Sequence, residues 1–447
     1  MKIRSSVLVI LLCIALGQCH IAFGQTKLND VIHYALSHSR EVKSANLQVE
    51  EARYIRREAL GQGLPQIEAS GTYSKMMLPD ISLPESLTAM IPSQYAPLLD
   101  NLKDINLYTL SAGVQVTQLI YNQSYLVGLK TTKKTQELYA LLKSKTEEEV
   151  IEEVANSYYQ TLSLMLQLNT IDKSLVNLKE IYRMVELSYR NDMVKESNVN
   201  RLKVNITNLE VNQQTLKNVI GIQLNYMKAL AGMPADTVLR LDTTLYRNNV
   251  EMFAQNPSFA ADNVVSYQVL LKQSELNSQD VKSAKARFTP TLAAFGQFNY
   301  SSYNTSSAIK NLTNMNTIGV KLSIPIFSSG VNYAKMKQAQ LKKVETDETI
   351  LKTKDLLSIN YSNALSEYQT AYNLLDVQRD NRDLAFKVYN QTSSQYKEGM
   401  ASMADLLNVN SDFLQAENSY NQQMLKCKLA EIKILKSTGS LNQIANN

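Results

Sequence analysis

The spacing of apolar residues alternates between two periods along this chain. A period of three to four residues, typical of amphipathic helices, covers residues 28–61, 125–190, 196–231, 264–287, 332–398 and 402–438. The stretches 125–190 and 332–398 contain no proline, and at ~1.5 Å per residue each predicts a helix about 100 Å long. Helices of this length owe most of their stability to packing, so we expect them to lie side by side.

Between these stretches the period changes to two, which predicts β-strands at residues 66–75, 107–120, 290–303 and 316–327. Each predicted strand has one polar and one apolar face. The polar positions are Glu68, Ser70, Thr72, Gln115, Thr117, Gln297, Asn299, Lys321 and Ser323. The apolar positions include Val114, Val116, Val320, Leu322 and Ile324. We expect the polar set to face a pore and the apolar set to face lipid, if the strands cross a membrane.

Two kinds of sheet fit this alternation. A soluble sheet with one dry face would show it, and so would strands long enough to cross a bilayer at a tilt. Aromatic residues near the strand ends favour the membrane alternative, because such residues form belts at both membrane interfaces. They are Tyr73, Tyr108, Tyr121, Tyr300 and Phe327. Four strands are too few to close a barrel, so a membrane-spanning sheet requires several copies; three would supply twelve strands.

The second half of the chain repeats the first. At a constant offset of 207 residues, Tyr182 aligns with Tyr389, and Gly232 aligns with Gly439. A constant offset indicates duplication, because unrelated coiled coils tolerate slips of seven residues. We therefore expect a leader (1–24), a first repeat (25–232), a middle segment (233–262), a second repeat (263–439) and a tail (440–447). The alternation over 237–244 predicts a short strand in the middle segment.

The two long helices each end at a short turn before a returning helix. Gly399 supplies a left-handed backbone position in the second turn, and Asp192, at the matching place in the first, is one of the few other residues that tolerate it. Both turns continue with a methionine, Met193 or Met400. We therefore expect two helical hairpins with similar but unequal tips.

The amino terminus has the pattern of a secretory signal peptide. Basic residues precede an apolar run from Val7 to Leu16, and small residues stand near Gly24, where we expect cleavage. A transmembrane helix needs about twenty apolar residues, and polar residues interrupt this run sooner. Lipid attachment at Cys19 is the alternative, although Gln18 occupies a position that should be small. Cleavage at Gly24 leaves Cys427 as the single thiol, so neither an internal disulfide nor a cysteine metal cluster is expected.

Charge and motifs argue against several functional classes. The formal net charge is +5 for the whole chain, and no basic tract indicates a nucleic-acid partner. No phosphate-binding loop, zinc-protease motif or nucleophile elbow is present. His33 and His38 are five residues apart on a helix and so do not share a face. The methionines fit packing better than copper or silver export. We expect no catalytic residue, metal or cofactor, and no enzyme.

Several motifs, taken in order, resemble the TolC-like outer-membrane efflux protein family. They are Leu28-Asn29-Asp30-Val31-Ile32, Leu64-Pro65-Gln66, Leu230-Ala231-Gly232-Met233-Pro234 and Gly319-Val320-Lys321-Leu322-Ser323-Ile324-Pro325-Ile326-Phe327. None of them is specific alone. Their order, the duplication and the helix lengths together extend the resemblance over nearly the whole mature chain.

The resemblance implies a mainly α protein with a small β part. Duplicated long-helix hairpins would form a periplasmic α-barrel, and four β-strands per protomer would contribute to a shared 12-stranded outer-membrane β-barrel in a homotrimer. The chain would then lie in outer-membrane lipid of a Gram-negative bacterium, with a large periplasmic portion.

The resemblance also implies partners and an entrance. A periplasmic adaptor protein, itself bound to an inner-membrane pump of RND or ABC type, would dock at tip residues Asp192, Met193, Gly399 and Met400. An entrance ring would include Asp405, with the uncharged Asn408 where relatives have a second acid, and Asn198 at the matching place in the first repeat. Alternatively, Asp405 is a helix-start carboxylate favoured by the helix dipole.

These expectations lead to a passive conduit for efflux or type I secretion, two functions that one tunnel can serve. A periplasmic or surface coiled-coil interaction protein without a membrane barrel is the alternative from another class.

Overall fold

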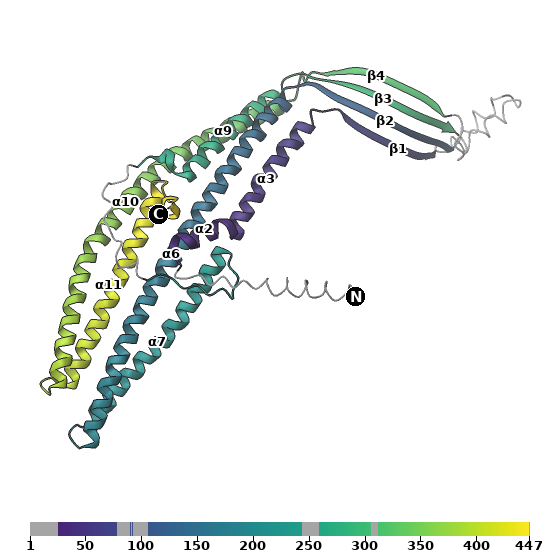
Figure 1. Cartoon of the computed structure of the whole chain (residues 1–447). Helices are drawn as coiled ribbons and strands as arrows, with labels where there is room; N and C mark the ends of the chain where they lie inside the picture. Colours follow the sequence, from purple (N-terminus) through teal and green to yellow (C-terminus); the bar gives the residue numbers. More distant parts are fainter. Residues whose placement is uncertain are drawn as a thin grey trace, which may run out of the picture. The chain divides into compact units, whose positions relative to one another are not determined.

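The computed structural model describes residues 26–77, 90, 92, 106–243, 259–304 and 312–446, and Figure 1 shows the chain. Its elements are α2 (Leu28–His38), α3 (Arg40–Gly61), β1 (Gln66–Met77), β2 (Asn106–Asn122), α6 (Gln123–Arg190), α7 (Glu196–Ala231), η2 (Ala261–Asn263), α9 (Val265–Ala286), β3 (Thr291–Asn304), β4 (Thr313–Ser323), α10 (Val331–Lys397), α11 (Met403–Ser437) and α12 (Gln443–Asn446). The predicted fold class is confirmed: two very long helices, each followed by a returning helix, are combined with a four-stranded antiparallel sheet. The predicted leader lies outside the described residues.

Two compact units divide the chain. One comprises Met1–Val49, Leu138–Leu271 and Asp347–Asn447, and the other comprises Glu50–Glu137 and Lys272–Thr346. Each unit takes segments from both halves of the chain, so the two halves do not fold into two separate domains. The first unit contains the helix turns and is called the hairpin unit below; the second contains the sheet and is called the sheet unit. The division into repeats remains a prediction.

The sheet has the strand order β1-β2-β3-β4, with every neighbouring pair antiparallel. Its register is continuous except for a bulge in β2 between Leu119 and Tyr121. The predicted fourth strand, 316–327, was wrong at its end, because β4 stops at Ser323. Pro325 lies two residues beyond and has no N–H to donate to a ladder, which explains the early end. Much of the two predicted loops, 76–106 and 304–315, lies outside the described residues.

The main core of the hairpin unit is formed by α2, α6, α7 and α11. Ile32, Val154 and Met227 are fully buried, and Met424 is nearly so. The carboxyl-terminal segment, predicted to be a tail, adds Leu441 and Ala445 to the same cluster. A second apolar cluster lies nearer the helix turns and joins α6, α7, α10 and α11. Both clusters combine residues from the two halves of the chain, which explains why the halves do not separate.

The first predicted helix is interrupted. Residues 28–61 form α2 and α3, which meet at Ser39, whose extended backbone (φ −58°, ψ 145°) ends α2. Gly232, the cap of α7, lies against this break with a φ of +69°, and a Cβ there would come within 2.5 Å of the His38 carbonyl oxygen. Gly439 repeats the arrangement after α11, with the same φ, against the carbonyl of Asn263. Each returning helix therefore ends where only glycine allows close approach.

The middle segment contains less regular structure than predicted. In place of a strand over 237–244, an isolated parallel bridge joins Leu241 to Thr26. The Thr26 N–H donates to the Arg240 carbonyl at 2.7 Å, and the Tyr158 hydroxyl donates to the Thr26 carbonyl at 3.1 Å. Residues 244–258 lie outside the described residues. Within the described part of the chain, no helix is both long and apolar enough to span a membrane.

Replacing Gly232 with alanine should destabilise the hairpin unit. A left-handed backbone costs an L-residue about 1–2 kcal/mol, and the new Cβ would also collide with the His38 carbonyl. Thermal unfolding followed by circular dichroism should therefore show a lower midpoint for Gly232→Ala. Gly221→Ala is the matched control, because Gly221 lies inside the same helix with open space at its Cβ position. That change should leave the midpoint unchanged or raise it, since alanine favours a helix by roughly 1 kcal/mol. Equal effects of the two changes would show that the Gly232 contact is unimportant.

Candidate functional site: the helix turns and the two-faced sheet

The register of the sheet places the predicted polar residues on one face. Glu68 pairs with Gln115, Gln115 with Gln297, and Gln297 with Thr317, so one polar row crosses all four strands. Antiparallel partners point to the same face and alternate along each strand. All nine predicted polar residues consequently share this face: Glu68, Ser70, Thr72, Gln115, Thr117, Gln297, Asn299, Lys321 and Ser323. That this face lines a pore remains a prediction, because a pore requires several copies of the chain.

The opposite face is apolar and largely exposed in the single chain. Val114 pairs with Phe298 and is 39% exposed, while Val320 pairs with Ala294 and is 69% exposed. Val116 and Leu322 lie on the same face. Ile324 follows the end of β4, so the ladder assigns it to neither face. A continuous exposed apolar face of this kind indicates that lipid or another protein covers it.

The predicted aromatic belt residues lie mainly on the apolar face. Tyr73, Tyr108 and Tyr300 stand near the strand ends that lead into the loops, and the rings of Tyr73 and Tyr108 stack at 6.3 Å. The bulge in β2 moves Tyr121 onto this face at the other end, where it pairs with Leu292. Phe327 lies beyond β4. Tyr303, another tyrosine near the loop end of β3, pairs with Thr109 on the polar face.

The two helix turns of the hairpin unit have the same backbone geometry. Asp192 has a φ of +59° and Gly399 a φ of +77°, which confirms the predicted left-handed positions. In the first turn the Met193 N–H donates to the Ser188 carbonyl at 2.9 Å, and in the second the Met400 N–H donates to the Gln395 carbonyl at 2.8 Å. Both helices therefore end in a Schellman motif, which exposes the methionine that follows. Asp192 adopts this conformation at a cost that glycine avoids.

The helices that follow the turns begin differently. Ser402 precedes α11, and its hydroxyl accepts the Asp405 N–H at 3.1 Å. The Asp405 carboxylate in return accepts the Ser402 N–H at 3.1 Å and the Ser402 hydroxyl at 2.6 Å. These bonds, first that of the hydroxyl and then that of the backbone, lower the pKa of Asp405. This reciprocal pattern is a capping box, and it supports the helix-start interpretation of Asp405.

The matching position in the first repeat has no such box. Lys195 precedes α7 and makes no side-chain cap bond, and Asn198 stands where α11 has Asp405. Asn408 lies one turn after Asp405 and is exposed, whereas Asn198 is half-buried. Apolar residues just behind the turns, among them Leu202 and Leu406, hold the starts of α7 and α11 in one cluster. The predicted ring residues thus lie in the same region of the hairpin unit.

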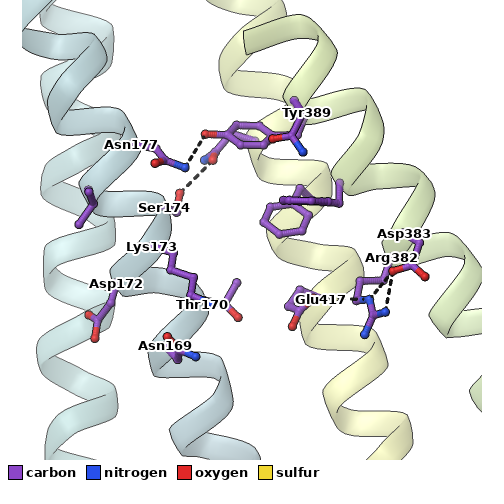
Figure 2. Close-up of a pocket in the computed structure, with 15 residues that line it drawn as sticks. Asn169, Thr170, Asp172, Lys173, Ser174, Asn177, Arg382, Asp383, Tyr389 and Glu417 are labelled. Carbon is purple, nitrogen blue, oxygen red and sulfur yellow. Dashed lines mark hydrogen bonds and ion pairs between the residues drawn. The ribbon is translucent and has the colours of Figure 1, made fainter. Parts of the chain in front are cut away.

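A groove of about 670 Å³ lies between α6 on one side and α10 and α11 on the other, as Figure 2 shows. Two hydrogen bonds cross it. The Ser174 hydroxyl donates to the Asn410 side-chain oxygen at 2.9 Å, and the Asn177 amide donates to the Tyr389 hydroxyl at 3.4 Å. These polar contacts join the first hairpin to the second. Ser174 and Asn410 are buried, so separating this pair would leave two buried polar groups without a partner, and the bond favours one register between the helices.

An arginine on the same groove ties α10 to α11. Arg382 donates to Asp383 at 2.9 Å from Nε and at 2.6 Å from a terminal nitrogen, and it lies 3.9 Å from the Glu417 carboxylate. Its guanidinium also lies over the Tyr420 ring at 4.3 Å. Glu417 is only 6% exposed, so Arg382 supplies a nearby positive charge to a nearly buried carboxylate.

Sequence reasoning missed Ser402 and Arg382. The Ser402-Met403-Ala404-Asp405 pattern, which follows Gly399 closely, is a recognisable capping-box signature. Arg382 had no local signal, because its partners Glu417 and Tyr420 stand on another helix. Contacts of that kind depend on how the helices pack.

Comparisons with known proteins agree on one family. A family model described as "Outer membrane efflux protein" matches residues 31–218 and 268–440. The "Probable efflux pump outer membrane protein TtgC" of Pseudomonas putida is 19% identical over 425 residues, which cover 93% of this chain and 84% of the relative. "Outer membrane protein TolC" of Salmonella enteritidis is 19% identical over 358 residues, covering 76% of this chain and 71% of the relative.

Solved structures of similar shape include an outer-membrane channel and an outer-membrane protein. The Campylobacter jejuni CmeC outer membrane channel has a TM-score of 0.73 at 18% identity, with 92% of this chain and 85% of that chain covered. The outer membrane protein VceC of Vibrio cholerae has a TM-score of 0.68 at 15% identity, with 92% and 96% covered. These similarities support the fold.

Removing the Ser402 hydroxyl should loosen the start of α11. Loss of a serine N-cap costs about 0.5–2 kcal/mol, so amide hydrogen exchange of residues 403–406 should accelerate about 2- to 30-fold in Ser402→Ala. Hydrogen exchange detected by mass spectrometry would measure it. Lys195→Ala is the matched control, because Lys195 occupies the same place before α7 without a side-chain cap bond. If both changes accelerate exchange equally, the capping box does not stabilise the second tip.

Proposed function

Because this chain belongs to the outer membrane efflux protein family, we propose that it forms, as a homotrimer, the passive outer-membrane conduit of an efflux system. Membership confirms the predicted class, an outer-membrane efflux channel with a large periplasmic portion. The family is one of channels and not of enzymes. It also argues against the alternative of a coiled-coil interaction protein without a barrel.

The two-faced sheet is the observation that carries the proposal. Its register gathers the polar residues on one face and leaves the apolar residues exposed on the other. In lipid, the apolar face is satisfied, and the backbone groups at the two edges must find partners. Four strands cannot close a barrel, but three copies supply twelve strands and remove every edge. The polar face then lines the pore, and the aromatic residues lie at the two membrane interfaces.

The hairpin unit would form the periplasmic tunnel and its entrance. We infer that Asp405, Asn408 and Asn198 line the narrow end, because all three follow a helix turn by no more than three helical turns. The turns themselves expose Asp192, Met193, Gly399 and Met400, and they are the surfaces offered to a periplasmic adaptor. A pump of RND or ABC type behind the adaptor supplies the energy, while the conduit itself performs no chemistry.

Replacing Asp405 with asparagine separates its two candidate roles. Asparagine keeps an oxygen that accepts the Ser402 N–H but carries no charge. If Asp405 lines the entrance, Asp405→Asn should reduce cation selectivity and cation block in single-channel recordings, with trimer yield unchanged. Asp412→Asn, two turns further from the tip on the same face of the helix, is the charge-matched control and should change both properties less. Unchanged conductance and block in Asp405→Asn would restrict Asp405 to capping.

Arginine on the two faces of β2 should have opposite consequences. Val114→Arg places a charge against lipid, which costs about 2–4 kcal/mol near the middle of the bilayer, and should reduce the amount of folded trimer in the outer membrane. Gln115→Arg, one residue along on the polar face, should be tolerated. Unheated gel electrophoresis of membrane fractions measures the trimer. If Gln115→Arg is the more harmful change, the assignment of the two faces is inverted.

A further inference from the structure

Charged residues are rare in the sheet and have a particular distribution. Among the strand residues that the structure describes, the charged ones are Glu68, Lys75 and Lys321. Lys75 belongs to the apolar face near the loops, where its ammonium lies 5.8 Å from the centre of the Tyr108 ring. The polar face therefore carries one negative and one positive residue. These two stand on β1 and β4, the two strands at opposite edges of the sheet in Figure 1.

Both edge strands have only one hydrogen-bonded neighbour in the sheet, β2 for β1 and β3 for β4. Glu68 and Lys321 are exposed. In a closed barrel, β1 of one copy must meet β4 of the next, and the alternating strand directions make that contact antiparallel. Two complementary charges on the polar face of the two strands are therefore brought to the same seam.

The lengths of the strands select a register for that seam. β1 has 12 residues and β4 has 11. When Gln66 meets Ser323, Met76 meets Thr313, and every residue of β4 obtains a partner. In this register Glu68 stands directly opposite Lys321. Near this end of the strands the other face stays apolar, because Ile67 meets Leu322 and Ala69 meets Val320. Nearer the loops, Tyr73 meets Asn316 and Lys75 meets Asn314.

Other registers fit less well. A slip of one residue would bring polar positions of one strand opposite apolar positions of the other, so the faces would no longer match. A slip of two residues keeps polar positions opposite polar positions but leaves residues unpaired at the strand ends. It also moves Glu68 and Lys321 from directly opposite to diagonal positions. Strand length and charge, which are independent observations, thus favour the same register.

The tilt of the strands provides a geometric check. The row that starts at Glu68 reaches Thr317 on β4, and the selected register pairs Thr317 with Thr72 of the partner subunit, four residues further along β1. Four residues span ~13 Å along a strand, and four strands span ~19 Å across the sheet. The ratio corresponds to a tilt of about 35°, at the lower limit of the range typical of barrels.

We propose that Glu68 of each copy forms an ion pair with Lys321 of the partner subunit on the pore side of the barrel seam, and that this pair sets the register in which the copies join. The proposal rests on the trimeric barrel proposed above. An exposed ion pair contributes little stability, but pairing β1 with β1 or β4 with β4 would bring like charges together, which is unfavourable. The three pairs also cancel the fixed charge of the polar face of the strands.

Cysteine cross-linking tests the register. The test combines Glu68→Cys and Lys321→Cys in a chain that also carries Cys427→Ala, so that no other thiol takes part. The native Cys427 is fully buried, and burial raises the pKa of its thiol to about 11. Directly opposite residues have Cα separations that a disulfide can bridge, whereas diagonal residues, ~7–8 Å apart, do not. Mild oxidation should therefore yield covalent trimers in heated, non-reducing gels, and dithiothreitol should remove them.

Two slipped pairs serve as matched controls: Ser70→Cys with Lys321→Cys, and Gln66→Cys with Lys321→Cys. Unheated gels report trimer formation independently of any cross-link. If trimers form but the covalent product appears in a slipped pair, or in none, the proposed seam is overturned while the conduit stands. If no variant and no unmodified chain forms trimers, the proposed conduit itself fails.

Exchange of the charges tests the ion pair itself. Glu68→Lys should place two lysines at each seam and lower the temperature at which the trimer dissociates, and adding Lys321→Glu should restore it. Gln297→Lys is the control, because Gln297 lies in the same polar row as Glu68 but on a strand away from the seam. A failure of the double exchange to restore the dissociation temperature, with Glu68→Lys alone destabilising, would show that the two side chains do not meet.

Discussion

Backbone hydrogen bonding at the edges of the sheet is the constraint on which the architecture depends. A strand in lipid has no water to satisfy its N–H and C=O groups, so an open edge is not permitted there. This chain has a four-stranded sheet with two open edges and an exposed apolar face. Neither feature is satisfied within one copy. The trimeric barrel proposed above would satisfy both, and its polar lining would come from the same alternation that makes the other face of the sheet apolar.

The long helices also depend on contacts beyond themselves. α6 and α10 have 68 and 67 residues, and most of the stability of a helix in a protein comes from tertiary packing and not from its own hydrogen bonds. Their stability comes from packing against the returning helices, and glycine allows those helices to end in close contact at Gly232 and Gly439. Buried polar bonds such as Ser174 to Asn410 then align the hairpins with each other. The glycines thus allow the helices to pack closely, and the polar bonds fix the register between the two hairpins.

The two tips of the hairpin unit differ in the residues that form them. Their backbones are alike, but the left-handed conformation costs free energy at Asp192 and not at Gly399. The helix after the second tip begins with the Ser402–Asp405 capping box, which the first lacks. A carboxylate held in this way remains ionised to lower pH, because the Ser402 bonds lower its pKa. Helix capping and a charge at the entrance are compatible roles for Asp405.

Local signals in the sequence were sufficient for the elements. Periodicity located four strands and the long helices to within a few residues, except that β4 ended earlier, before Pro325, and that Ser39 divided the first helix. The alternation also assigned the polar and apolar residues to faces that the register bears out, because side chains alternate strictly along a strand.

Features that depend on contacts between residues distant in sequence were determined only by the tertiary structure. The bulge that moves Tyr121 to the apolar face is a property of two paired strands. The contact of Arg382 with Glu417 and the merging of both halves into two units depend on how helices meet. The opposite placement of Glu68 and Lys321 on the two edge strands became visible only from strand order and register. A single sequence specifies local periods directly, but it specifies such pairings only through the packing free energy of the whole chain.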